Sequence, residues 1–180
     1  MQELPQSLIH TALAHKATIA VAESCTGGRI AAEITTVSGA SAAFLGAVVA
    51  YDNAVKHTLL GVPRETLDQF GAVSAETAYA MANGVRHALG ATHGLATTGI
   101  AGPTGATTSK PVGRVYIAIA TPAETRVERF QFTGSRNTVQ RLATEAALRI
   151  LLTSLFGAQP HQTPAAQAPS QSQPARPDAT

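Results

Sequence analysis

Residues 18–28, TIAVAESCTGG, carry the clearest structural signal in the chain. Thr18–Ala22 is short, apolar and contains β-branched residues, which is typical of a buried strand. The glycine pair Gly27 and Gly28 permits a tight turn, and we expect a helix to begin there. The pattern therefore predicts a buried strand that passes almost at once into a helix.

The polar residues between this strand and helix are candidates for chemistry, because α/β proteins keep their sites at the carboxyl ends of strands. Backbone N–H groups at a helix start can also stabilise an anion or a developing oxyanion. Ser24 is the candidate nucleophile. Cys25 is a rival, since a helix N-terminus lowers a thiol pKa, but we favour a small buried cysteine that packs under the turn. A tight turn capped by a hydroxyl, without any chemistry, would use the same residue types.

A nucleophilic serine needs a base, and Lys56 is the candidate. Phe44–Tyr51 is a second predicted strand, and Lys56 follows it by only a few residues on a predicted helix that ends at Leu60. Its amine could reach the same sheet edge, where burial would lower its pKa toward the working range. An exposed helix lysine is the alternative. We expect the adjacent His57 to lie at the surface.

The remaining segments predict an alternation of helices and strands. Ser74 is the expected N-cap of a long Ala-rich helix that Gly90 ends. Strands are expected at residues 93–98, 113–120 and 126–132, the last two as an antiparallel hairpin, and a final helix starts at Ser135 or Asn137. The fold class is therefore α/β: a three-layer α/β/α sandwich on a mixed, mostly parallel five-stranded sheet that ends in an antiparallel hairpin.

A second polar loop, residues 99–112, follows a predicted strand and should lie beside the first turn. Lys110 and Pro111 could close this loop. Arg136, at a predicted helix start, could grip a phosphate through two parallel hydrogen bonds. The residues that we expect to contact substrate are Thr26, Gly27 and Gly28 in the first turn, Thr98 and Gly99 where the second loop begins, and Arg136.

Composition narrows the function classes. The chain has 180 residues, 44% of them hydrophobic, with a formal net charge of +2 and a pI near 9.0, and its basic residues are scattered. One core is expected, and a dedicated nucleic-acid surface is not. A single cysteine cannot form an intramolecular disulfide, and the histidines show no metal-binding spacing. We predict no metal and no cofactor.

Domain organisation follows from a change in composition near Phe156. Residues 1–156 should form one domain, whereas residues 157–180 are rich in Gln, Pro, Ala and Ser and are expected to be a disordered tail. Met1–Lys16 lacks the pattern of a signal peptide, and no stretch approaches the roughly 20 apolar residues of a membrane span. We expect a cytoplasmic protein without membrane association.

Two common catalytic loops do not match the first turn. It lacks the Gly-Lys-Ser/Thr ending that binds phosphates and magnesium in phosphate-transfer enzymes. It also departs from the Gly-x-Ser-x-Gly pattern of the α/β-hydrolases. A phosphate-transfer or nucleotide-binding protein is therefore the weaker alternative.

Six stretches of the chain resemble one family, that of the CinA C-terminal domain and the stand-alone nicotinamide-nucleotide amidases related to it. The resemblance covers about Leu8 to Phe156. The matching stretches are AESCTGG at 22–28, YDN at 51–53 followed by Lys56, LGV at 60–62, GAVS at 71–74, TGIAGP at 98–103 and KPVG at 110–113.

The resemblance implies an amidohydrolase that converts nicotinamide mononucleotide to nicotinate mononucleotide and ammonia without a metal. It implies that Ser24 is the nucleophile and Lys56 its general base, and that Ser41, Tyr51 and Thr98 line the site. Arg136 matches a family arginine, but Ser135 stands where the family has Asp. It also implies a homo-oligomer such as a dimer. The alternative is a non-catalytic CinA-like binding or competence-accessory module.

Overall fold

The computed structural model describes residues 3–157, so the predicted tail from residue 158 onward lies outside the described residues. The elements follow the expected alternation. In chain order they are α1 (Glu3–Ala14), β1 (Ile19–Glu23), α2 (Arg29–Thr35), the 3-10 helix η1 (Ala40–Ala42), β2 (Phe44–Val49), α3 (Asn53–Leu60), α4 (Arg64–Phe70), α5 (Ala75–Ala88), β3 (His93–Gly99), β4 (Arg114–Ala120), β5 (Thr125–Gln131) and α6 (Arg136–Gly157).

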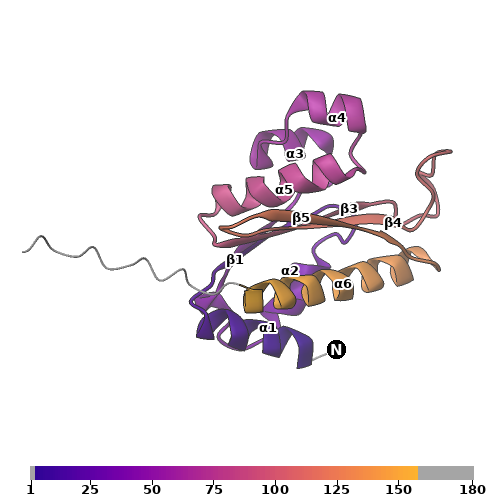
Figure 1. Cartoon of the computed structure of the whole chain (residues 1–180). Helices are drawn as coiled ribbons and strands as arrows, with labels where there is room; N and C mark the ends of the chain where they lie inside the picture. The colour runs from indigo at the N-terminus through magenta and orange to yellow at the C-terminus, as the bar shows by residue number, and fades with distance from the viewer. Residues whose placement is uncertain (1–2, 158–180) are drawn as a thin grey trace, which may run out of the picture.

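The five strands form one mixed sheet in the order β2-β1-β3-β4-β5. β1 pairs in parallel with β2 and with β3, whereas β3–β4 and β4–β5 are antiparallel. Helices α3, α4 and α5 lie on one side of the sheet, and α1, α2 and α6 lie on the other (Figure 1). The predicted three-layer α/β/α sandwich with its terminal hairpin is confirmed.

The central strand β1 is buried on both faces. Ile19 and Val21 belong to the core beneath α1, α2 and α6, and Ala20 and Ala22 belong to the core beneath α5. Small residues on the α5 side allow that helix to lie close to the sheet: a Cβ on Gly94 of β3 would come within 2.2 Å of a carbonyl oxygen of α5. The carboxyl end of β1 is therefore held on a rigid support.

Side-chain caps fix where three helices begin. Ser74 accepts a hydrogen bond from the Thr77 N–H of α5 at 3.1 Å, which confirms the predicted cap. Asp52 caps α3 in the same way through the Ala54 N–H. Helix α6 begins directly after Ser135, the first of the two predicted start points.

The buried face of α1 stops short of the end of the helix. Leu8, Ile9 and Ala12 are buried, but Leu13 is 42% exposed. The helix ends one residue later, at Ala14, and the face that packs against α6 does not extend to Leu13.

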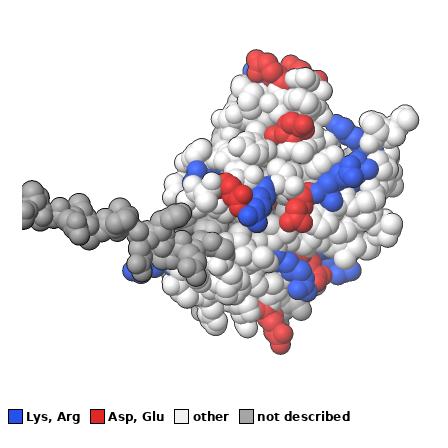
Figure 2. Space-filling model, viewed as in Figure 1, with Lys and Arg blue, Asp and Glu red and all other residues white. Residues whose placement is uncertain are grey.

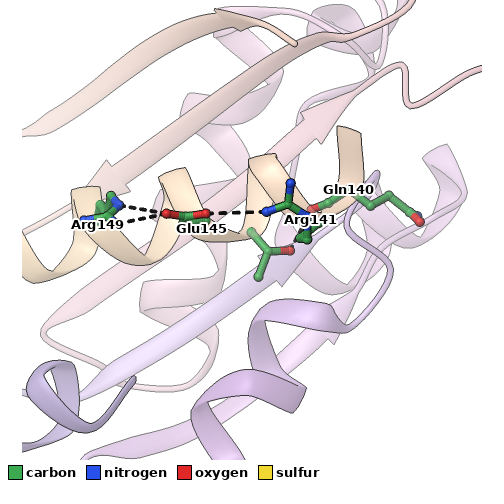
Figure 3. A network of polar contacts seen from close by, with 5 residues as sticks. Gln140, Arg141, Glu145 and Arg149 are labelled. Carbon is green, nitrogen blue, oxygen red and sulfur yellow. Dashed lines mark hydrogen bonds and ion pairs between the residues drawn. The ribbon is translucent and has the colours of Figure 1, made fainter. Parts of the chain in front are cut away.

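Charged residues of both signs are interspersed on the face shown in Figure 2. On α6, Glu145 lies between Arg141 and Arg149, one turn away on either side (Figure 3). Such exposed pairs add only about 0.3–0.5 kcal/mol each. Within residues 3–157, no helix is both long enough and apolar enough to cross a bilayer.

Candidate active site

Ser24 lies directly after β1, between the ends of its two parallel neighbours. Its N–H donates to the Thr97 carbonyl of β3 at 3.0 Å, and the Ala50 N–H, just after β2, donates to the Glu23 carbonyl at 2.8 Å. Ser24 therefore stands at the middle of the edge where three parallel strands end, as the sequence predicts. Its hydroxyl makes no hydrogen bond to another described residue.

The buried carboxylate of Glu23 holds the turn by accepting hydrogen bonds from its backbone. It is fully buried and accepts hydrogen bonds from the N–H groups of Gly28, Ile30 and Ala31 at 2.9, 3.1 and 2.9 Å. Glu23 thus satisfies the start of α2, where unpaired N–H groups otherwise remain. These amides are no longer free to hold an oxyanion, which corrects our general expectation for the helix start.

Two further contacts hold the turn in place. The Thr26 hydroxyl lies 2.8 Å from the Thr97 hydroxyl of β3, and Gln140 of α6 donates to the Cys25 carbonyl at 2.9 Å. Within the described part of the chain, the N–H groups of Cys25 and Thr26 donate to no backbone carbonyl. They are the amides of this turn that remain available to a bound oxygen.

A cavity of about 290 Å³ opens beside Ser24. It brings together six of the predicted site residues from five segments of the chain, and its lining consists of Ser24, Cys25, Tyr51, Lys56, Ala72, Val73, Thr98, Gly99, Ile100, Ala101, Gly102, Thr104, Gly105 and Arg136. Thr26, Gly27 and Gly28 lie in the adjoining turn but outside this lining. Their contact with substrate stays a prediction.

Lys56 is buried in the cavity wall, with 1% of its surface exposed. Its Nζ donates to the carbonyl oxygens of Ala50 at 2.9 Å and Tyr51 at 3.3 Å. Burial lowers the Lys56 pKa from its ordinary value, an effect that the Asp52 carboxylate partly opposes. The exposed-lysine alternative is therefore wrong. His57 faces elsewhere and bonds the Val62 carbonyl through Nδ1.

The thiol of Cys25 is a poor nucleophile in this structure. Burial raises its pKa to about 12, and the nearby Glu23 carboxylate acts in the same direction. A thiol with this pKa stays protonated at neutral pH, and the protonated form does not attack. Between the two predicted nucleophiles, the electrostatics favour Ser24.

The Gly99–Val112 loop forms one side of the cavity and is fastened at two places. At its beginning, the buried Thr98 hydroxyl donates to the Ala72 carbonyl at 2.6 Å. Near its end, Lys110 Nζ donates to the Phe70 carbonyl at the end of α4, also at 2.6 Å. Lys110 therefore ties the loop to the rest of the domain, the closing role suggested by the sequence.

Arg136 lies at the mouth of the cavity and is already oriented. Its Nη1 donates to the Gly102 carbonyl at 2.8 Å, and its Nη2 donates to the Tyr51 hydroxyl at 2.6 Å. Among the described residues it forms no ion pair with a carboxylate. The neighbouring Ser135 bonds Thr138, and Arg136 is held by Tyr51 and Gly102.

Ser41 lies away from this cavity. It belongs to η1, which precedes β2, whereas the cavity lies beyond the other end of that strand. Six strand residues span about 20 Å. The structure does not bring the Ser41 of the same chain to the site.

Other regions offer less for catalysis. A groove of about 460 Å³ lies between α3 and α5, and its lining consists of Leu59, Leu60, Gly61, Ala80, Asn83, Gly84, His87 and Ala88. It has no hydroxyl or thiol nucleophile. Within residues 3–157, no three His, Cys, Asp or Glu side chains come close enough together to hold a metal ion.

The fold and cavity define an α/β domain with a serine and a buried lysine at the carboxyl edge of its parallel strands. Residues 1–155 match the family described as CinA C-terminal domain. The CinA-like protein of Geobacter sp. strain M21 is 51% identical over 139 residues, which are 77% of this chain and 34% of that protein. The chain belongs to the CinA C-terminal domain family.

Solved structures of proteins from this family have the same fold. The competence/damage inducible protein CihA from Agrobacterium tumefaciens superposes with a TM-score of 0.83 at 36% identity, covering 86% of this chain and 94% of that one. Competence damage-inducible protein A from Klebsiella pneumoniae subsp. pneumoniae MGH 78578 superposes with a TM-score of 0.85 at 32% identity. The match covers 88% of this chain and 98% of that one. The chain spans about a third of the length of the curated relatives it matches.

Proposed function

We propose that this chain is an amidohydrolase that converts nicotinamide mononucleotide to nicotinate mononucleotide and ammonia through a Ser24–Lys56 acyl-enzyme mechanism, in pyridine nucleotide salvage. The family resemblance suggests the substrate. The position of Lys56 supports the chemistry, because its buried side chain and Ser24 line the same cavity at the carboxyl edge of the sheet.

The hydrogen bonds of Lys56 favour its neutral form as a base. A neutral amine has two N–H donors and one lone pair, and the carbonyls of Ala50 and Tyr51 accept from the same nitrogen. If both N–H groups are used there, the lone pair is left for a proton from the Ser24 hydroxyl. The lowered pKa increases the fraction of the amine that is neutral at working pH.

The reaction then follows from the positions of the donors. Ser24 Oγ attacks the amide carbon and passes its proton to Lys56 Nζ. The N–H groups of Cys25 and Thr26 stabilise the oxyanion, a contribution of about 3–4 kcal/mol for one such donor in other enzymes. Lys56 returns the proton to the departing nitrogen, and ammonia leaves. Water next attacks the acyl-enzyme and gives a proton to Lys56, which passes it to Ser24 Oγ as the ester bond breaks and the carboxylic acid leaves.

Arg136 supplies the contact that distinguishes a nucleotide from free nicotinamide. Its guanidinium has five N–H donors, and two of them bond Gly102 and Tyr51, so others remain for a phosphate. Because no carboxylate neutralises it among the described residues, an anionic group at the cavity mouth gains the full interaction. We infer that the substrate phosphate binds there.

The direct test is ammonia release by chelator-treated protein from nicotinamide mononucleotide, with free nicotinamide and the dinucleotide as comparison substrates. We expect turnover of the mononucleotide, loss of at least about 10³-fold in kcat for Ser24→Ala, and nearly full activity for the neighbouring Cys25→Ala control. Full activity in folded Ser24→Ala would refute the mechanism. A folded wild-type protein that binds the mononucleotide without turnover would support the non-catalytic binding module.

A further inference from the structure

The carbonyl of Cys25 differs from the other carbonyls of the turn that carries the candidate nucleophile. The carbonyls on either side of it accept from the backbone N–H groups of Gly27 and Arg29 at 3.2 and 3.3 Å. Among the described residues, no backbone N–H donates to the Cys25 carbonyl. Its partner is the side-chain amide of Gln140 on α6, at 2.9 Å. The peptide group that follows Cys25 is therefore held from outside the turn, by a helix distant in the chain.

Arg29 fixes which end of the Gln140 amide faces the turn. A glutamine side chain can direct either its oxygen or its NH2 group toward a partner. Nη2 of Arg29 donates to Gln140 Oε1 at 3.3 Å and to Asn137 Oδ1 at 2.9 Å. Because the oxygen faces this guanidinium, the NH2 group is left to face Cys25. Hydrogen bonds thus run in one direction, from Arg29 through Gln140 to the Cys25 carbonyl.

The Cys25 carbonyl and the Thr26 N–H belong to the same trans peptide group. Such a group is planar, and its C=O and N–H point in opposite directions. A contact that fixes the direction of the Cys25 carbonyl therefore also fixes the direction of the Thr26 N–H. A hydrogen bond accepted by a carbonyl also polarises its peptide group, which makes the N–H a stronger donor.

We propose that Gln140 is a positioning residue for the amidase reaction, because it holds and polarises the peptide group whose N–H stabilises the oxyanion. This inference rests on the proposed function. The oxyanion develops as Ser24 Oγ bonds to the amide carbon and the electron pair of the substrate C=O bond moves onto its oxygen. Gln140 therefore acts on the transition state more than on the bound substrate, and its loss should lower kcat rather than raise KM.

The contact also lets one segment of α6 serve both ends of the substrate. Arg136 and Gln140 are four residues apart, so they lie on the same face of this helix. Arg136 is held at the cavity mouth by the Gly102 carbonyl and the Tyr51 hydroxyl. Arg136 then binds the phosphate, while Gln140 acts on the peptide group beside the reacting carbon.

The test measures kcat and KM for nicotinamide mononucleotide in variants of the full chain. Gln140→Met keeps the length of the side chain but has no donor. We expect its kcat to fall about tenfold and its KM to stay within about twofold of wild type, because the Thr26 N–H remains and only its direction and strength change. Asn137→Ala is the matched control. It removes the other contact of Arg29 with α6, leaves the Cys25 carbonyl bonded, and should keep the wild-type kcat.

Gln140→Glu separates positioning from simple fastening of α6 to the turn. The carboxylate keeps the shape of the side chain and accepts more strongly from Arg29, but it offers no N–H to the Cys25 carbonyl. We expect a kcat at least as low as that of Gln140→Met, with a Tm equal to or above the Tm of Gln140→Met. If Gln140 only fastened the helix, kcat and Tm would change together.

An NMR measurement tests the contact in the ligand-free protein. The carbonyl carbon of Cys25 and the amide nitrogen of Thr26 should both shift upfield in Gln140→Met and stay in place in Asn137→Ala. Unchanged resonances, or an unchanged kcat in Gln140→Met beside an active wild type, would overturn the inference and leave the proposed function standing. A folded wild type without turnover would overturn the proposed function and the positioning role with it.

Discussion

Glu23→Gln probes the support beneath the candidate nucleophile with almost no change in shape. One carboxylate oxygen accepts from Gly28 and Ile30, and the other accepts from Ala31. In the glutamine, the side-chain oxygen can still accept from Gly28 and Ile30, but the side-chain NH2 group must then face the Ala31 N–H. One buried donor loses its acceptor and meets another donor.

The size of the effect follows from that single lost contact. A buried donor left without a partner costs about 1–3 kcal/mol, so we expect Glu23→Gln to lower the free energy of unfolding by about 2 kcal/mol. For a chain of this length, that lowers Tm by about 4–8 °C. Glu23→Ala removes both acceptor oxygens and all three hydrogen bonds, and should lower Tm by more.

Urea and thermal unfolding followed by circular dichroism measure this prediction. The control is Glu33→Gln, which makes the same chemical change on α2 at a side chain that bonds no other described residue, and it should stay within about 0.5 kcal/mol of wild type. A Glu23→Gln protein as stable as Glu33→Gln would show that Glu23 does not hold the start of α2.

Four further predictions concern the cavity. Because the neutral amine is the base, kcat/KM should rise with pH as Lys56 loses its proton, with a midpoint below 10.5. The Lys56 pKa is lower in the folded chain than in the unfolded chain, so at a pH between these two values the unfolded chain binds more protons. The free energy of unfolding should therefore rise with pH in this interval. Lys56→Met should abolish this rise in urea titrations at alkaline pH. The thiol of Cys25, with its pKa raised to about 12, should react with iodoacetamide at pH 8 at least about tenfold more slowly than in the urea-unfolded chain. Lys110→Met should speed limited proteolysis within residues 103–109 and raise KM, because it removes the bond to Phe70; unchanged cleavage would exclude this fastening role.

Local patterns in the sequence predict much of the fold. The buried strand ending at Glu23, the Ser74 cap and the β4–β5 hairpin each depend on neighbouring residues, and each is confirmed. The same logic places Ser24 at a strand end. Lys56 is harder, because its position in the chain allows either burial or exposure, and only the tertiary packing of α3, which lies against α5, settles which.

Contacts between distant segments could not be predicted. Gln140 reaches the Cys25 carbonyl across 115 residues, and Arg136 reaches Tyr51 across 85. No periodicity or spacing encodes such pairs, since they depend on how α6 packs on the face of the sheet. The role of Glu23 was also missed, although the N–H groups that donate to it are local; an acidic residue a few positions before a helix start was the available signal.

The bonds of Arg136 to Tyr51 and Gly102 have a consequence for ligand affinity. A long flexible side chain that becomes fixed only when a ligand arrives costs about 0.5–1.5 kcal/mol of binding free energy in lost rotamer freedom. Here the guanidinium loses that freedom when the domain folds, before any anion is present. Inhibitors that present a phosphate or carboxylate to this position should therefore bind with a smaller entropic penalty, and loss of the Tyr51 hydroxyl should restore that penalty.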